Sequence, residues 1–287
     1  MKNLAGKTAL LTGANGGLGI HVARALAQEQ MNLLLVAYPE SGLEGFRAAV
    51  AVACPQAKVL VADLRLPTEC ARVVRHAEES FGAVDVLVNN AGLEFSSVYH
   101  ELSEEQVRSV LAVNLEAPML LARLVLPGMV ERKSGHIVNI SSLAGKGAPA
   151  CQEPYVATKA ALAAFTFSLR ATYQGTGVSA SAVCPGFVEE AGIYARIKTR
   201  TRRSAPAMLS GNSPERVAQA VVRVIRRDVP ELIVNRFPIR PALALSALSP
   251  AAGAWLMDVM GVNEFFRSAA RAERQARTQG AVDGTVP

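Results

Sequence analysis

Aromatic residues make up only 5% of the 287-residue sequence, and histidine and cysteine are scarce and scattered. There are four of each, with no C-x-x-C pair and no histidine at a metal-ligand spacing. We therefore expect no metal site, no catalytic histidine, and buried or inert thiols in a reducing compartment. These residues are Cys54, Cys70, Cys151, Cys184, His21, His76, His100 and His136.

The excess of positive over negative charge is small too, because the formal net charge is only +6. The basic residues gather at 196–203 and after 263 rather than along one continuous stripe, so we do not expect a nucleic-acid partner. Residues 1–7 lead almost directly into the first apolar run and leave no room for a signal peptide. On this basis we expect a cytoplasmic protein.

Half of the residues are apolar, and short apolar runs alternate with helical patterns along the chain. The alternation predicts βαβ units, and hence an α/β fold with a doubly wound parallel sheet of about seven strands covered by helices on both faces. The strands are expected at 7–12, 32–37, 58–62, 84–88, 135–140, 178–184 and 231–235. The helices are expected near 17–30, 41–53, 67–80, 103–130, 154–173 and 213–227.

A glycine-rich turn from Thr12 to Gly19 joins the first expected strand to the first expected helix. Glycines let the backbone turn tightly and approach a pyrophosphate, which the N–H groups of the helix N-terminus then hold. Asp63 follows the third strand, and Asn89-Asn90-Ala91-Gly92 follows the fourth. Because the carboxyl ends of parallel strands meet at one edge of the sheet, these signals together predict a dinucleotide site.

Tyr155 and Lys159 lie four residues apart in an expected helix, and Ser142 lies thirteen residues before the tyrosine. One face of the helix then presents the phenol and the ammonium to the same pocket. A neighbouring cation favours the phenolate and brings the tyrosine pKa toward the working range, while Ser142 binds the oxygen whose proton moves. The pattern predicts a site that interconverts an alcohol and a carbonyl.

The same spacing recurs at Tyr194 and Lys198, where no serine precedes the pair. This second pair stands in the basic stretch up to residue 203, which we interpret as a solvated loop. The first pair instead follows a strand-like run, and it opens an Ala-rich helix after Pro154, a residue suited to a first helical turn. We therefore assign the chemistry to the first pair.

With these motifs in this order, residues 5–235 resemble the short-chain dehydrogenase/reductase family, in its single-domain branch with a Thr-Gly-x-x-x-Gly-x-Gly turn. The resemblance implies a Rossmann-like fold and a nicotinamide cofactor. It makes Tyr155 the general acid/base, and Lys159 the residue that binds the ribose and lowers the tyrosine pKa. It assigns the substrate oxygen to Ser142 rather than to Ser141.

The resemblance also implies that Asn114 holds a water that relays protons toward the lysine. A kink or a packing role within a long helix is the alternative for this residue. The cofactor-binding residues that the resemblance implies, besides Tyr155 and Lys159, are Gly13, Asn15, Gly17, Leu18, Gly19, Tyr38, Asp63, Leu64, Asn90, Ala91, Gly92, Pro185, Gly186 and Val188.

Two departures from the family's pattern limit what the resemblance implies. The second strand ends in Ala37 and Tyr38, where NAD-preferring members resemble one another in having an acid and NADP-preferring members often have a following arginine. The glycine turn has Asn15 and Gly16 in place of a basic residue. Since nothing repels a 2′-phosphate, NADP(H) is favoured and NAD(H) is possible. Glu190 stands where the family often has Thr, which puts a carboxamide contact in doubt.

Residues 236–287 exceed what the family core in 1–235 needs and form a C-terminal extension. The stretch 241–262 has a single charge, and its prolines and glycines favour two short apolar helices broken at Pro250 over a spanning helix. A loose tail is expected from Thr278. The extension adds packing or a subunit contact, covers a lipophilic substrate, or makes a peripheral membrane contact. The arginines that would flank such a membrane contact are Arg236, Arg240, Arg267 and Arg271.

We expect an NAD(P)-dependent oxidoreductase that interconverts a secondary alcohol and a ketone, acts on a fairly hydrophobic acyl, steroid-like or polyketide substrate, and forms a homodimer or homotetramer. One rival is an epimerase or dehydratase, whose glycine turn is usually spaced Gly-x-x-Gly-x-x-Gly. The other is a non-catalytic cofactor sensor, which has no need of the proton donor Tyr155.

Overall fold

The computed structural model describes residues 1–38, 43–206, 209 and 211–282, and within them seven strands form one parallel sheet in the order β3-β2-β1-β4-β5-β6-β7. Leu10 of β1 lies opposite Leu34 of β2 and Leu87 of β4, which fixes the register at the centre of the sheet. The strand order reverses between β1 and β4, and ligands bind at such a point in open α/β sheets. The strands are β1 (Thr8–Thr12), β2 (Asn32–Ala37), β3 (Lys58–Val61), β4 (Val86–Asn89), β5 (Gly135–Ile140), β6 (Val178–Pro185) and β7 (Glu231–Val234).

The helices begin where the sequence has N-cap and proline signals. Ser213 Oγ accepts a hydrogen bond from the Arg216 N–H at 3.3 Å, and Pro214 occupies the first turn that follows, as expected. The helices are α1 (Gly19–Gln28), α2 (Leu43–Ala53), α3 (Pro67–Phe81), α4 (Glu104–Leu111), α5 (Ala117–Glu131), α6 (Ala144–Gly147), α7 (Glu153–Thr172), α8 (Gly192–Thr201), α9 (Pro214–Arg227), α10 (Arg240–Leu248), α11 (Pro250–Val259) and α12 (Val262–Val282).

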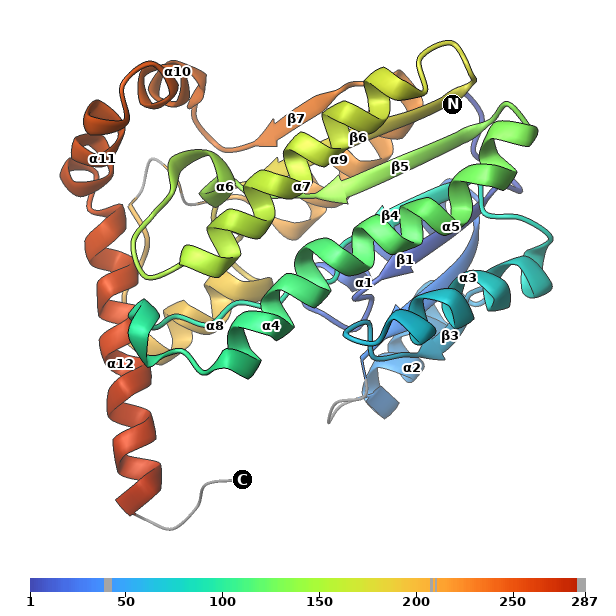
Figure 1. Ribbon diagram of the computed structural model, residues 1–287. Helices are drawn as coiled ribbons and strands as arrows, with labels where there is room; N and C mark the ends of the chain where they lie inside the picture. Colours follow the sequence, from blue (N-terminus) through green and yellow to red (C-terminus); the bar gives the residue numbers. More distant parts are fainter. Residues whose placement is uncertain (39–42, 207–208, 210, 283–287) are drawn as a thin grey trace.

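An apolar core lies on each face of the sheet. Leu26 of α1 and Val221 of α9 belong to one core, and Val73 of α3 and Leu121 of α5 belong to the other. Figure 1 shows α3, α5 and α7 across one face of the sheet, with α1 and α9 behind it. The strands are therefore covered on both sides, which explains why they are continuous apolar runs, and the predicted doubly wound α/β fold is confirmed.

The expected long helix near 103–130 is two helices, α4 and α5, joined by a π turn at Ala112–Glu116. Within the described residues the span Glu104–Glu131 is long and apolar enough to cross a membrane by length and composition, but 56% of its most apolar window is buried in the protein. Core helices of globular proteins pass the same test, and α5 packs on the sheet beside α3.

The C-terminal extension has the expected break, because Ser249 Oγ caps α11 by accepting from the Ala252 N–H at 3.3 Å and Pro250 starts that helix. The expected loose tail is corrected in part: α12 continues through residues 278–282, and 283–287 lie outside the described residues. The helix α12 runs down the side of the molecule past α8 (Figure 1).

Candidate active site

The carboxyl edge of the sheet opens on a cavity of about 1170 Å³. The loops that follow the strands line one part of it, and residues of α8 and the C-terminal extension line the rest. Two predicted site residues, Gly19 and Asn114, are buried behind the cavity wall. The predicted residues that line the cavity are Gly13, Asn15, Gly17, Leu18, Tyr38, Asp63, Leu64, Asn90, Ala91, Gly92, Ser142, Tyr155, Lys159, Pro185, Gly186 and Val188.

Three glycines of the turn have no room for a side chain. A Cβ on Gly13, where φ is +63°, would lie 2.7 Å from the Ala91 Cα, and one on Gly17 would lie 2.5 Å from the Gly192 nitrogen. A Cβ on Gly19 would lie 2.3 Å from the Gly13 carbonyl oxygen. Because each obstacle is backbone, only glycine fits these positions, and the turn leaves its surface open to the phosphates of a dinucleotide.

The turn is tied to the loop after β4. Asn90 Nδ2 donates to the carbonyl oxygens of Thr12 and Gly13, each at 3.0 Å. In return Thr12 Oγ1 accepts from the backbone N–H groups of Asn90 and Ala91, at 3.0 and 3.1 Å. These bonds explain why the two motifs, almost eighty residues apart, form one wall.

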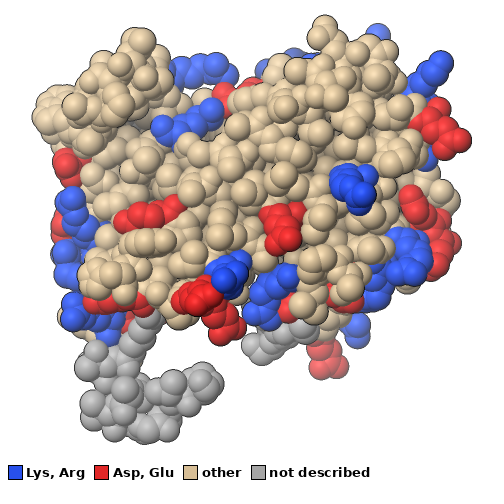
Figure 2. Space-filling model, viewed as in Figure 1, with Lys and Arg blue, Asp and Glu red and all other residues tan. Residues whose placement is uncertain are grey.

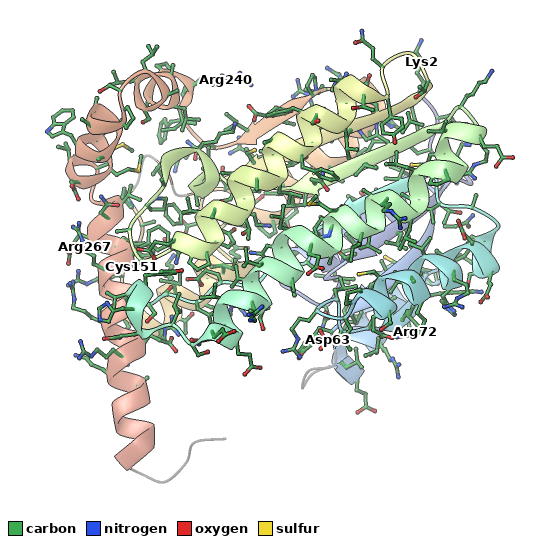
Figure 3. All side chains as sticks on the ribbon, viewed as in Figure 1. Lys2, Asp63, Arg72, Cys151, Arg240 and Arg267 are labelled. Carbon is green, nitrogen blue, oxygen red and sulfur yellow. The ribbon has the colours of Figure 1, made fainter. Side chains whose placement is uncertain are left out.

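At the far end of that wall, Tyr38, Asp63 and Arg65 form a polar cluster. The Arg65 guanidinium donates to both carboxylate oxygens of Asp63, at 2.7 to 3.0 Å, and to the Tyr38 hydroxyl at 3.0 Å. The Arg65 hydrogen bonds hold the pKa of Asp63 below its usual range. Asn15 fixes the backbone of Tyr38 through two hydrogen bonds. Figure 3 labels Asp63 beyond the end of β3, at this edge.

The residues predicted to transfer the proton lie together in the cavity wall. Lys159 is only 4% exposed, lies with its Nζ 5.6 Å from the centre of the Tyr155 ring, and donates to the Ile140 carbonyl oxygen at 2.9 Å. Ser142 makes a hydrogen bond with Tyr155, whereas the Ser141 hydroxyl donates to the Lys159 carbonyl oxygen at 2.7 Å. The geometry therefore gives Ser141 a structural role and leaves Ser142 beside the phenol.

The electrostatics of the pair differ from the expectation. Burial raises the pKa of Tyr155 to about 12, and only the hydrogen bond from Ser142 acts in the opposite direction. Burial also lowers the pKa of Lys159 to about 8. The expected lowering of the tyrosine pKa by the lysine is thus not found in this geometry, because desolvation disfavours the charged form of both groups.

Asn114 lies in the π turn between α4 and α5 and is fully buried. Its amide accepts from the Leu93 N–H at 2.7 Å and donates to the Leu93 carbonyl oxygen at 2.9 Å and to Thr158 Oγ1 at 3.2 Å. A Cβ placed on Gly92 would lie 3.7 Å from Asn114 Oδ1 and 3.6 Å from Lys159 Nζ, so the two side chains flank this glycine. The proton relay stays a prediction.

Glu94, in the loop after β4, does not itself line the cavity but acts on two residues that do, and sequence reasoning missed it. Its Oε1 accepts from Ser96 Oγ and from Gln152 Nε2, both at 2.5 Å. Burial raises the pKa of Glu94, against the effect of these bonds and of two arginines of α8. Gln152 lines the cavity three residues before Tyr155, and the Glu94 charge raises the pKa of that tyrosine. The only sequence signal was its place two residues after the Asn89–Gly92 motif.

The second Tyr-x-x-x-Lys pair is not in a solvated loop, which corrects that interpretation. It lies in α8, where Tyr194 is 5% exposed and its hydroxyl accepts from the Ala205 N–H at 2.9 Å. Lys198 points to Glu189, with a separation of 2.7 Å, and does not line the cavity. Tyr194 therefore has a packing role, and its lysine lies outside the site.

The other end of the cavity is apolar and is built largely by the extension. Phe187 packs against Tyr194, Phe265 and Phe266, with ring centres 4.9 to 5.8 Å apart. Ile239, Ala242, Leu243, Met257, Val262 and Phe266 of the extension line this end. Glu190, the residue that replaces the family's usual Thr, also lines the cavity.

The thiols behave as expected, since all four cysteines are free and buried. Burial raises the pKa of each thiol, which keeps the reactive thiolate scarce. Within the part of the chain that the structure describes, no group of three or more His, Cys, Asp or Glu side chains is placed to hold a metal ion.

Comparisons with known proteins agree with this geometry. The chain is 40% identical to the ketoacyl reductase HetN of Nostoc sp. over 282 residues, which is 96% of each chain. It is 33% identical to a D-beta-hydroxybutyrate dehydrogenase of Cupriavidus necator, over 70% of this chain and 78% of that one. Among solved structures, a variant of actinorhodin polyketide ketoreductase with NADPH matches with a TM-score of 0.73 and 31% identity, over 80% of this chain and 95% of that one.

A metagenomic short-chain oxidoreductase in complex with NADP matches with a TM-score of 0.68 and 29% identity, over 82% of this chain and all of that one. The family described as short chain dehydrogenase matches residues 7–201. This match covers more than half of the chain and contains the glycine turn, Ser142, Tyr155 and Lys159. The chain belongs to the short-chain dehydrogenase family and is an oxidoreductase of that family.

Proposed function

We propose that the chain is an NADP(H)-dependent ketoreductase that interconverts a ketone and a secondary alcohol on a hydrophobic acyl, steroid-like or polyketide substrate. One observation carries the proposal. Ser142, Tyr155 and Lys159 line one cavity, between the end formed by the glycine turn and the apolar end formed by the extension. The names of the relatives support it, because two of them are ketoacyl reductases.

In the proposed reaction, the glycine turn and the loop after β4 would hold a nicotinamide cofactor, whose chemistry would be to supply the hydride in reduction and to accept it in oxidation. Tyr155 gives its hydroxyl proton to the carbonyl oxygen during reduction and takes it back during oxidation. Ser142 donates a hydrogen bond to the same oxygen and so holds it within reach of the phenol. Lys159, fixed by the Ile140 carbonyl, binds the ribose and faces the phenolate when the proton has left.

The glycine turn and the tied loop after β4 form the proposed pyrophosphate site. Arg65 and Tyr38 would lie beside the adenosine ribose, where no acid stands at the end of β2. The Arg65 charge is shared with Asp63, so we propose a modest preference for NADP(H) rather than a strict one.

The apolar end of the cavity supports a hydrophobic substrate. We propose that residues 1–235 form the catalytic domain and that the extension completes the substrate wall. Its side chains, with the ring cluster around Phe187, would exclude water from the apolar part of a ketone substrate.

The test is turnover of NADPH and NADH by the purified chain against a panel of ketones, from small water-soluble ketones to 3-oxoacyl thioesters and polycyclic ketones. We expect NADPH-dependent reduction that improves as the apolar part of the substrate grows. Cofactor binding without turnover of any ketone would contradict the proposal and favour a cofactor sensor.

A further inference from the structure

Helices α10 and α11 carry apolar stripes that face outward. On α10 the exposed positions Pro241, Ala244, Leu245 and Leu248 have the spacing i, i+3, i+4 and i+7, which is one face of a helix. On α11 the exposed positions Ala251, Ala254, Trp255 and Val259 again lie along one face, which also carries the half-exposed carboxylate of Asp258. The larger of these side chains protrude strongly: Leu248 is 86% exposed, Val259 63% and Trp255 62%.

The outward stripes are not needed to build the substrate cavity. Leu243 and Met257, on the opposite faces of the same helices, already line it. The two helices also pack closely together, because a Cβ on Gly253 would lie only 2.8 Å from the Ser246 Cβ. Each helix therefore has one face committed to the protein and another apolar face open to the surroundings.

Arginines outnumber carboxylates by four to two in residues 236–271, which contain the stripes. Asp258 is the single charged residue in 241–262, and it is engaged with Arg267 at 3.4 Å and with Asn263 Nδ2 at 2.9 Å. Among the described residues, no carboxylate forms an ion pair with Arg236 or Arg240, at the start of α10. In Figure 3 Arg240 lies beside α10 and Arg267 lies on α12 below α11, and in Figure 2 this corner of the molecule is mostly tan, with cations and an anion at its edge.

Other exposed apolar side chains of comparable size, such as Val52 on α2 and Leu66 before α3, stand singly, which is ordinary for a protein surface. On α10 and α11 four such side chains, Leu245, Leu248, Trp255 and Val259, gather on two helices that pack together, as interaction surfaces do. A second copy of this chain would fit the apolar stripes. However, a two-fold contact brings equivalent surfaces together, and would place the unpaired arginines of both copies near one another.

An anionic lipid surface meets both requirements, since it accepts apolar side chains and attracts the flanking guanidinium groups. Tryptophan prefers this interface region. We propose that α10 and α11 form a peripheral membrane contact, with the outward stripes inserted among the headgroups of anionic lipids. The contact goes beyond the reductase activity and places the apolar end of the cavity, lined from the same helices, close to the lipid phase.

The chain offers a direct probe, because Trp255 is its only tryptophan. We expect the fluorescence of the full chain to shift to shorter wavelength on addition of vesicles made of equal parts phosphatidylcholine and phosphatidylglycerol. Vesicles of phosphatidylcholine alone should give a smaller shift, and high salt should reduce the difference, because the attraction of the arginines is screened.

Sedimentation with the same vesicles tests the residues. Leu248→Asp should weaken binding roughly tenfold or more, since a strongly exposed apolar side chain is replaced by an anion. Arg240→Glu should weaken binding to the anionic vesicles in particular. Val52→Asp is the matched control, because Val52 is 87% exposed on α2, and it should bind like the unaltered chain.

An unshifted tryptophan spectrum with anionic vesicles, or equal binding by Leu248→Asp and Val52→Asp, would overturn the proposal. So would a lipid-free oligomer of the unaltered chain that Leu248→Asp converts to smaller species, because a second copy would then cover the stripes. Reduction of a water-soluble ketone should be the same in all these variants. Loss of membrane binding is thereby distinguishable from failure of the proposed reductase activity.

Discussion

Lys159 Nζ donates a hydrogen bond of 2.9 Å to the carbonyl oxygen of Ile140, the last residue of β5. The bond joins the helix that carries the tyrosine to the strand that leads into Ser142. It holds the ammonium below the Tyr155 ring rather than in contact with its hydroxyl. The lysine is therefore oriented by the fold itself.

We predict that Tyr155→Phe lowers kcat for ketone reduction by at least about 100-fold, because general acid catalysis contributes that much or more. Cofactor affinity, measured by fluorescence titration with NADPH, should change little. The two Tyr-x-x-x-Lys pairs provide the control: Lys159→Ala should be nearly inactive, and Lys198→Ala, whose ammonium pairs with Glu189, should remain active. Equal inactivation by both lysine variants would contradict the assignment.

The cofactor preference gives a second prediction. Ala37 lines the cavity at the end of β2, so Ala37→Asp should place a charge beside a 2′-phosphate. We expect the ratio of kcat/KM for NADPH to that for NADH to fall by roughly 10- to 100-fold, as a like-charge contact of a few kcal/mol requires. Ala37→Asn is the uncharged control and should change the ratio much less.

Arg65→Gln should lower the same ratio of kcat/KM for NADPH to that for NADH without introducing an anion. An unaltered chain that already prefers NADH tenfold would contradict the assignment to NADP(H).

Most of the fold could be predicted from local signals. The parts that could not be predicted are those that depend on distant contacts. The strand β5 was expected with the bounds that it has, because its apolar run is bounded by turn residues. Helix α8 was taken for a loop because arginines and lysines recur along it. Tyr194 on that helix is buried by Phe265, about seventy residues later, so the local sequence carries no sign of its burial.

The candidate site follows the same rule. The positions of Tyr155 and Lys159 on one helix face could be predicted, since helical spacing is local. The burial that sets their pKa values could not, because it comes from the closing of the cavity by other elements. Glu94 was missed for this reason: a glutamate in a loop is usually solvated, and here Gln152, 58 residues later, donates a hydrogen bond that holds it beside the cavity.

Glu94 gives a third prediction. Its charge raises the pKa of Tyr155, so Glu94→Gln should lower that pKa and move the rise of alcohol oxidation with pH to lower pH. The pH dependence of kcat/KM in the oxidation direction measures the shift. Glu105→Gln removes another carboxylate that lines the cavity and serves as the control. If both variants showed the profile of the unaltered chain, Glu94 would not act on the phenol.

The last prediction concerns stability and rests on His136 in β5, which is 1% exposed. Its Nε2 lies 2.9 Å from Ser181 Oγ, and because that hydroxyl donates to the Val229 carbonyl oxygen, the neutral imidazole is the donor to Ser181. Burial lowers the pKa of His136 to about 4, from about 6.5 in an unfolded chain. Between these values the unfolded state binds the additional proton, so the stability contribution is complete above pH 6.5 and is lost as the pH falls toward 4.

A pKa difference of this size corresponds to about 3 kcal/mol of unfolding free energy over that window. We therefore expect urea unfolding at pH 7, 6 and 5 to show an unfolding free energy that decreases as the pH is lowered. In His136→Asn the fall should be much flatter, even if the variant is less stable at pH 7.

The matched variant His100→Asn, which alters an exposed histidine, should keep the slope of the unaltered chain. Asp228, held near His136 and paired with Arg170, has a lowered pKa and so loses its own contribution only at more acidic pH. An unchanged slope in His136→Asn would therefore mean that this histidine takes up its proton without unfolding the sheet.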